Sequence, residues 1–134
     1  MVNENALESR IDKARELHKS GYNCCQCVLM AFPELHGLTN QQAAAISAGA
    51  GGGIGGQGEV CGVVSAMTML AGLKHWNSPA DKAEVYRRVR ELSDIFKTRH
   101  GSLLCRELKC GKTPCQELIV NGVEIFANYI ENAK

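Results

Sequence analysis

Residues 59–74 read EVCGVVSAMTMLAGLK, and this stretch decides the fold because it is apolar on almost every face of a helix. A helix that is apolar all round packs inside the molecule. Its uncharged run of about 14 residues is shorter than the roughly 20 that a membrane-spanning helix needs. We therefore expect a buried central helix over residues 59–74 and no membrane association.

The segments on both sides of this helix show helical periodicity. Upstream, the pattern predicts helices at residues 5–19, 24–32 and 40–48. Downstream, it predicts one at residues 79–99, a further one capped by Ser102, and a last one capped by Thr113 that carries the apolar residues Leu118, Ile119, Val123, Phe126 and Ile130. No stretch alternates between apolar and polar residues as a strand does. The sequence predicts an all-α fold of about six helices, in a single domain over residues 1–134.

The composition narrows the class of protein. A hydrophobic fraction of 45% is typical of a soluble globular protein, and a net charge of +1 gives no reason to expect nucleic acid as a partner. The first ten residues lack the basic start and apolar stretch of a signal peptide. We therefore expect a cytoplasmic protein. In that reducing compartment its seven cysteines are more often metal ligands, catalytic thiols or buried apolar residues than disulfides.

Four cysteines fall at the start of a predicted helix: Cys24, Cys61, Cys105 and Cys115. The unpaired amides and the dipole of a helix N-terminus stabilise a thiolate, which makes it a better nucleophile or metal ligand. An anionic cluster bound by several thiolates would be stabilised in the same way. These four residues form the candidate site. The roles of Cys25, Cys27 and Cys110 stay open between core packing and additional thiols.

A glycine-dense loop over residues 49–58 precedes Cys61. Residues 53–58 match the pattern G-x-G-x-x-G, but a dinucleotide site needs a preceding strand and an acidic residue about 20 positions later. The segment before the loop is predicted to be helical, and the acidic residue is absent. We expect instead that this backbone passes close to the cysteine site, where a side chain would collide.

Several of these stretches together resemble the C_GCAxxG_C_C family of redox-active proteins. They are GYNCCQCVL at 21–29, the glycine run 51–58 leading into EVCG at 59–62, CREL at 105–108, and the last cysteine, Cys115, which opens the final helix. Carried over residue by residue, the family's cysteines match Cys24, Cys61, Cys105 and Cys115. The chain departs from the family at residues 63–66, VVSA, where the family more often has Ala first and Gly last. A similar domain of split-Soret cytochrome c is associated with an iron–sulfur centre, so the resemblance implies a cluster site here.

The sequence leaves three functions open. In the first, Cys24, Cys61, Cys105 and Cys115 bind an iron–sulfur cluster, of the [2Fe–2S] type, for electron transfer or redox sensing. In the second, a cysteine pair without metal cycles between dithiol and disulfide, and the protein is an oxidoreductase. In the third, four thiolates hold zinc in a binding module. The partner would be an unidentified redox protein, and a homodimer stays open. Of the histidines, His100 is the best reserve base or ligand.

Overall fold

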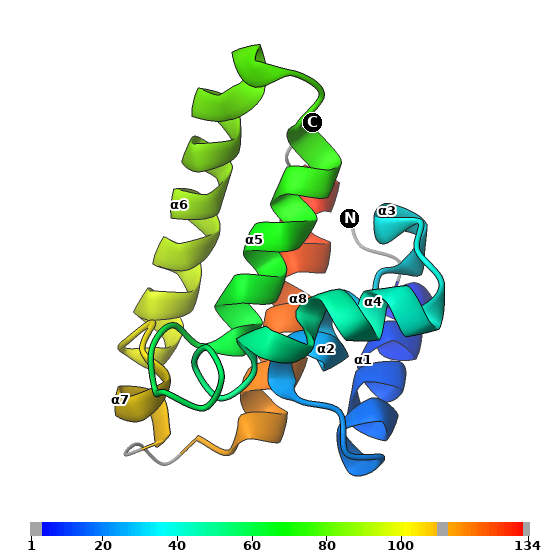
Figure 1. The fold of residues 1–134 in the computed structure, drawn as a ribbon, viewed down its shortest axis with the longest axis vertical. Coiled ribbons are helices and arrows are strands. Elements are labelled where there is room, and N and C mark those ends of the chain that lie inside the picture. Colours follow the sequence, from blue (N-terminus) through cyan, green and yellow to red (C-terminus); the bar gives the residue numbers. More distant parts are fainter. Residues whose placement is uncertain (1–3, 110–112, 133–134) are drawn as a thin grey trace.

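The structure, a computed structural model, describes residues 4–109 and 113–132 (Figure 1). In this part of the chain every regular element is helical, which confirms the all-α prediction. The elements are α1 (Glu4–Lys19), α2 (Cys24–Leu29), α3 (Pro33–His36), α4 (Asn40–Ser47), α5 (Gly62–His75), α6 (Lys82–His100), α7 (Cys105–Lys109) and α8 (Cys115–Asn132), with 3₁₀ turns η1 (Ala48–Ala50) and η2 (Pro79–Asp81).

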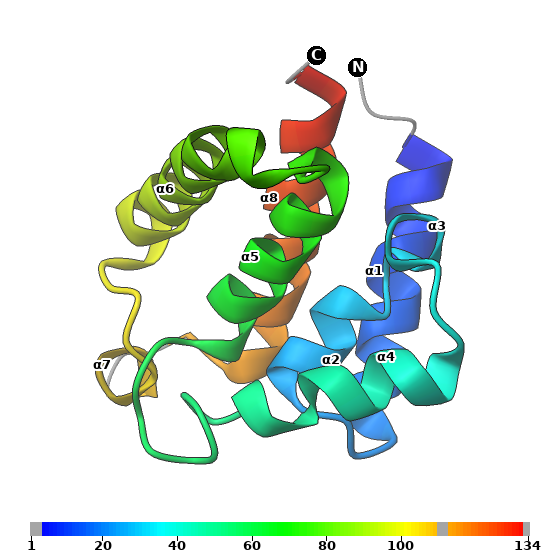
Figure 2. The same ribbon diagram turned by 45° about the horizontal axis from the view of Figure 1, so that its top comes forward.

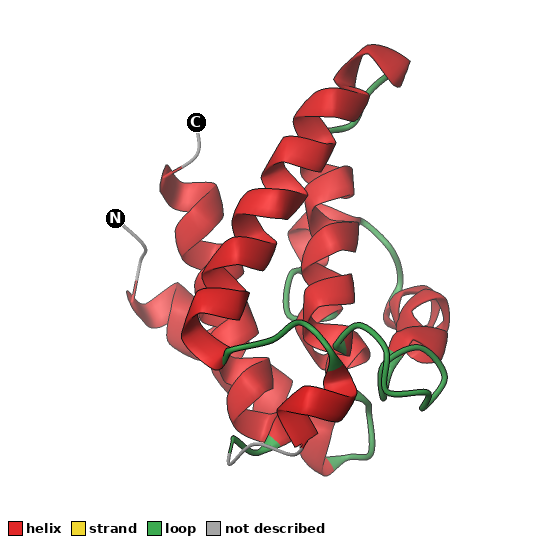
Figure 3. Ribbon diagram, turned by 90° about the vertical axis from the view of Figure 1, so that its left-hand side faces the viewer, coloured by secondary structure: helices red, strands yellow, loops and turns green. Residues whose placement is uncertain are grey.

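Helix α5 lies at the centre and packs against α2, α6 and α8 (Figure 1). Figure 3, coloured by secondary structure, shows helices joined by loops throughout the described residues. Its residues Val63, Met67 and Leu70 are almost completely buried. A Cβ placed on Gly122 of α8 would lie 2.2 Å from Cγ1 of Val63, so only glycine allows the two helices to approach this closely. The missing side chain of Gly122 therefore sets the distance between α5 and α8.

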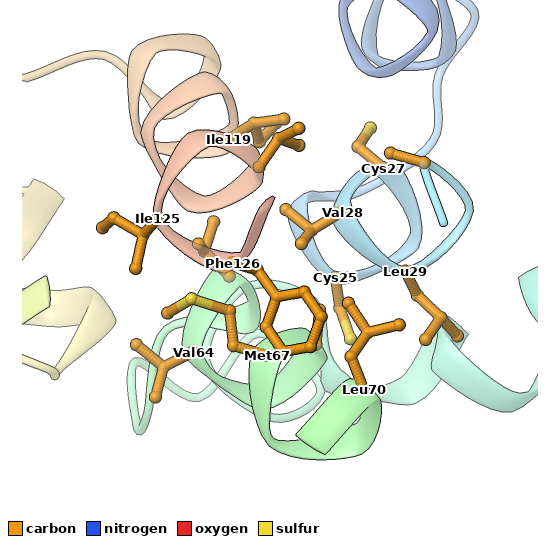
Figure 4. Packing of buried hydrophobic residues seen from close by; sticks show 14 of the residues in the cluster. Cys25, Cys27, Val28, Leu29, Val64, Met67, Leu70, Ile119, Ile125 and Phe126 are labelled. Carbon is orange, nitrogen blue, oxygen red and sulfur yellow. The ribbon is translucent and has the colours of Figure 1, made fainter. Parts of the chain in front are cut away.

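Helix α2 is short, but it belongs to the core. Cys25, Cys27 and Val28 are fully buried, and Cys25 points toward Leu70 and Phe126 while Cys27 points away from them (Figure 4). Asn23 begins α2 with a reciprocal cap, because its side chain accepts a hydrogen bond from the Gln26 amide and the Gln26 side chain accepts one from the Asn23 amide. This confirms the cap that the sequence predicts.

The central helix begins later than the sequence predicts. Residues 59–61 are not helical, since Val60 forms an isolated antiparallel bridge with Leu104 and the Cys61 amide donates to the Leu103 carbonyl, 2.7 Å away. The helix predicted over residues 24–32 is shorter than expected, because α2 ends at Leu29, and a separate helix that the sequence did not predict, α3, begins at Pro33.

One stripe of α5 is not covered. Leu73 and Trp76 are 49% and 45% exposed, and together with Ile46 of α4 they line an apolar groove of about 650 Å³. The expectation of a buried helix therefore holds for the faces toward α2, α6 and α8 but not for this stripe. Within the described residues, we find no helix with the length and hydropathy required to cross a membrane.

Candidate functional site: the cysteine cavity

A cavity of about 210 Å³ lies where several helices begin, and the thiol-bearing residues Cys24, Cys61, Cys105 and Cys115 all line it. Cys24, Cys105 and Cys115 are the first residues of α2, α7 and α8, and Cys61 immediately precedes α5. The expected position at a helix start is thus found for three of the four, while Cys61 occupies the cap position. The remaining walls include the apolar side chains of Val63, Leu108 and Leu118.

The four cysteines differ in burial. Cys61 and Cys105 are buried at 5% and 7% exposure, Cys24 is half-buried and Cys115 is exposed. The cavity is therefore shielded from solvent on the side of α5 and α7, and it is open to solvent on the side of Cys115.

Backbone hydrogen bonds bring Cys61 and Cys105 together, although they are far apart in sequence. The Cys105 amide donates to the Glu59 carbonyl over 2.6 Å, and the Arg106 amide donates to the Gly58 carbonyl over 3.1 Å. These bonds join the end of the glycine loop to the start of α7, and Figure 2 shows the loop running from α4 past α7 to α5. The loop thus places two cysteines at one wall of the cavity.

The expectation that the loop backbone passes close to the cysteines is confirmed at Gly53, and Gly62, the first residue of α5, comes equally close to another cysteine. A Cβ on Gly53 would lie 2.7 Å from Cβ of Cys105, and a Cβ on Gly62 would lie 2.4 Å from Sγ of Cys24. Gly53 also has a φ of 75°, which favours glycine. A side chain at either position would displace a cysteine.

Cys24 and Cys61 form a hydrogen-bonded pair. The bond from the Cys61 thiol, helped by backbone amides of Gly52, Cys25 and Gly62, lowers the pKa of Cys24 to about 6 against the opposing effect of burial. The same bond, together with burial, raises the pKa of Cys61. The hydrogen bond therefore favours a thiolate on Cys24, where the amides converge, and keeps the proton on Cys61.

The neighbouring thiols behave differently. Burial raises the pKa of both Cys25 and Cys27 to about 12. Neither lines the cavity, and Cys27 donates a weak hydrogen bond to the Tyr22 carbonyl at 3.6 Å. Both therefore act as core residues in this structure. Cys110, whose role the sequence also left open, lies outside the described residues.

The thiols of the site do not converge on one metal ion. The six cysteines Cys24, Cys25, Cys27, Cys61, Cys105 and Cys115 are free thiols. Among the residues described, no three or more His, Cys, Asp or Glu side chains are spaced to hold a single metal ion. The four cysteines of the site therefore surround a space instead of meeting at a point.

Two polar side chains of the cavity were not anticipated. His18, near the end of α1, and Lys109, at the end of α7, both line it. His100, the predicted reserve ligand, does not; its ring lies 4.7 Å from that of Phe96 and its Nε2 lies 3.4 Å from Nδ2 of Asn121. No local motif marks His18, because only the packing of α1 brings it to the cysteines.

Comparison with known proteins identifies a family. A family model described as "Putative redox-active protein (C_GCAxxG_C_C)" matches residues 22–129, which is well over half of the chain and includes the four cysteines of the cavity. No curated protein and no solved structure matches the chain.

Proposed function

This chain belongs to the C_GCAxxG_C_C family of redox-active proteins, and we propose that Cys24, Cys61, Cys105 and Cys115 bind an iron–sulfur cluster for electron transfer or redox sensing. The observation that carries the proposal is that four free thiols from four separate segments line one small cavity. Four cysteines are the usual ligand set of a [2Fe–2S] cluster. Such a cluster is the form we propose.

The chemistry of the donor set fits this group. Thiolates are the required ligands, and Cys24 already has a thiol pKa of about 6 because of the Cys61 hydrogen bond and the surrounding amides. Helix N-termini at Cys24, Cys105 and Cys115 favour negative charge. The sulfurs surround a space, which suits a multi-atom cluster better than the single tetrahedral ion that a zinc site requires.

The protein's own residues would then have separate tasks. The cluster, when bound, would supply one-electron chemistry. Val63, Leu108 and Leu118 would exclude water from it, and Lys109 would offset part of the thiolate charge. The exposure of Cys115 indicates the side from which a redox partner would approach.

A second function is favoured by one specific observation, the hydrogen bond between Cys24 and Cys61. In a dithiol mechanism, the Cys24 thiolate attacks a disulfide of a partner protein and releases one partner thiolate, which takes up a proton. The Cys61 thiol then loses its proton and attacks the mixed disulfide. This forms a Cys24–Cys61 disulfide and releases the second partner thiolate. The two cysteines lose two electrons and the partner disulfide gains them.

Anaerobic reconstitution with ferrous iron and sulfide separates the two functions. We expect a visible absorption spectrum with stoichiometric iron and sulfide, which is abolished or sharply weakened in Cys61→Ser. The control is Cys27→Ala, because Cys27 is fully buried outside the cavity, and it should retain most of the absorption.

Two results would contradict a cluster bound by these four cysteines. Absence of any cluster spectrum, combined with a reversible two-electron couple lost in both Cys24→Ser and Cys61→Ser, would establish the dithiol function. A spectrum that survives Cys61→Ser but disappears in Cys27→Ala would place the site at the Cys24–Cys27 turn.

A further inference from the structure

The glycine loop holds its shape through its own backbone. The amides of Gly55, Gly58 and Glu59 donate to the carbonyls of Gly49, Gly52 and Gly53 at 2.8, 3.1 and 2.9 Å. No side chain is needed for these bonds, so the loop is a preformed unit. Its position over the cavity then depends on how its two ends are attached.

The far end of the loop is attached to α7 by the backbone bonds of Cys105 and Arg106 described above. The N-terminal end of the loop is attached by the side chain of Asn23. Nδ2 of Asn23 donates to the Ala48 carbonyl over 2.9 Å. The Asn23 side chain also packs on Gly51 so tightly that a Cβ there would lie 2.4 Å from its Cγ. Gly51 has an extended φ of −69°, so glycine is required at this position for space and not for conformation.

Asn23 is attached at the same time to the residue that follows it. Its Oδ1 accepts from the Gln26 amide at 3.0 Å, and its own amide donates to Oε1 of Gln26 at 2.9 Å, which fixes the start of α2 at Cys24. The amide of Gly52, next to the Gly51 contact, bonds to the Cys24 sulfur. One side chain therefore joins the α2 start to the loop that covers it.

We propose that Asn23 is a positioning residue that clamps the glycine loop against Cys24, so that the loop both fixes the sulfur in the cavity and covers it. The side-chain Nδ2 donates to the Ala48 carbonyl at the start of the loop, and the side-chain Oδ1 caps α2. The importance of Cys24 rests on the proposed function. The clamp itself is a property of the reduced, cluster-free protein and can be measured in it.

Two variants break the clamp from opposite sides. Asn23→Asp keeps the capping oxygen but replaces the Nδ2 donor with an oxygen that repels the Ala48 carbonyl. Gly51→Ala keeps Asn23 but adds a methyl group that would overlap the Asn23 side chain. The matched control is Gln26→Ala, which weakens the same helix cap and removes the bond from Nε2 of Gln26 to the Ala44 carbonyl of α4, but leaves the Asn23 contacts to Ala48 and Gly51 in place.

The readout is the rate at which a bulky maleimide labels Cys24 relative to the exposed Cys115 in the same reduced, metal-free sample, resolved by mass spectrometry of peptides. We expect the ratio to rise roughly tenfold in Asn23→Asp and in Gly51→Ala, because each loses an attachment that opposes local opening of the loop. Gln26→Ala should change the ratio by less than about twofold, even if urea unfolding shows a similar loss of stability.

The clamp is wrong if Asn23→Asp and Gly51→Ala leave the ratio at the wild-type value. It is also wrong if Gln26→Ala raises the ratio as much as they do, since Asn23 would then act only as a helix cap. Failure of the wild type to assemble a cluster would contradict the proposed function, but it would not alter this labelling measurement.

Discussion

At the scale of single residues, position on a helix separates thiols that are adjacent in sequence. Cys24 and Cys25 are neighbours, yet the pKa of the first is lowered to about 6 by a hydrogen bond and amides, while burial raises that of the second to about 12. Successive residues of a helix point in directions about 100° apart, so one faces the cavity and the other the core. The sequence predicts which cysteines begin helices, but not which two share a proton.

This difference predicts selective alkylation of Cys24 by a small reagent. In reduced, metal-free protein at pH 7, iodoacetamide should modify Cys24 faster than a free thiol of ordinary pKa, because only the thiolate reacts. The rate should fall as the pH drops through about 6, where the thiolate is protonated. Peptide mass spectrometry at several pH values measures both.

The control for this experiment is Cys25→Ala. It should leave the fast phase of alkylation, which is the reaction of Cys24, unchanged because Cys25 stays protonated and buried. Cys24→Ser should remove the fast phase. A fast phase that persists in Cys24→Ser, or a Cys24 rate that begins to rise only near pH 9, would contradict the assignment of the thiolate.

At the scale of elements, periodicity predicted the long helices well, and non-local contacts explain the errors. Helices α1, α4 and α6 begin and end within a few residues of the predicted ranges, because caps and apolar stripes are local signals. The start of α5 was placed too early because residues 59–61 pair with residues 103–105, a contact that no local pattern reveals. Helix α3 was missed because four residues are too few to show a period.

The contact between α5 and α8 gives a prediction for helix packing. Gly122→Ala should destabilise the fold by about 1–3 kcal/mol, since the new Cβ would overlap Cγ1 of the buried Val63. The clash outweighs the gain of about 1 kcal/mol that alanine normally gives over glycine inside a helix. Urea unfolding of the reduced protein measures the change.

A second glycine serves as the matched control. Gly72 lies inside α5, and a Cβ placed there would meet no atom within 4 Å beyond the adjoining residues and backbone of its own helix, so Gly72→Ala should stabilise the fold by about 0.5–1 kcal/mol through helix propensity alone. Equal effects of the two substitutions, in either direction, would mean that the close approach of α5 and α8 is not what Gly122 provides.

At the scale of the whole molecule, the site is assembled by the fold. The four cysteines were identified from predicted helix starts and from the family resemblance, because both are features of short segments. His18 and Lys109 reach the cavity only through the packing of α1 and α7, and Asn23 was identified as a cap but not as an attachment for the loop. Sequence patterns predict which residues have the right chemistry, whereas the residues that enclose them depend on how the helices pack.

The buried thiols also determine how global stability depends on pH. Burial and local contacts raise the pKa of Cys25, Cys27, Cys61 and Cys105 in the folded protein, so each stays protonated where the unfolded chain would ionise at about its ordinary value of 9.0. The unfolded state therefore binds fewer protons than the folded state above pH 9, and the free energy of unfolding falls as the pH rises. Among the cysteines that the structure describes, Cys24, whose pKa is lowered, acts in the opposite direction.

We accordingly expect the urea midpoint of the reduced, metal-free protein to rise from pH 7 to 8.5, because the unfolded state then binds the proton that Cys24 has lost in the folded state, and to fall steadily from pH 9 to 10.5. Cys25→Ala should have a lower midpoint at pH 7, because a buried side chain is shortened, but a shallower fall above pH 9, because one ionisation of the unfolded state is removed. Cys115→Ala is the control, since Cys115 is exposed and its loss removes no buried thiol. The fall of its midpoint with pH should match that of the wild type.

An alkaline slope that is the same in Cys25→Ala and the wild type would show that Cys25 does not contribute to the loss of stability. A midpoint that rises above pH 9 would mean that the unfolded state binds more protons than the folded state there, which is the opposite of what the raised thiol pKa values require.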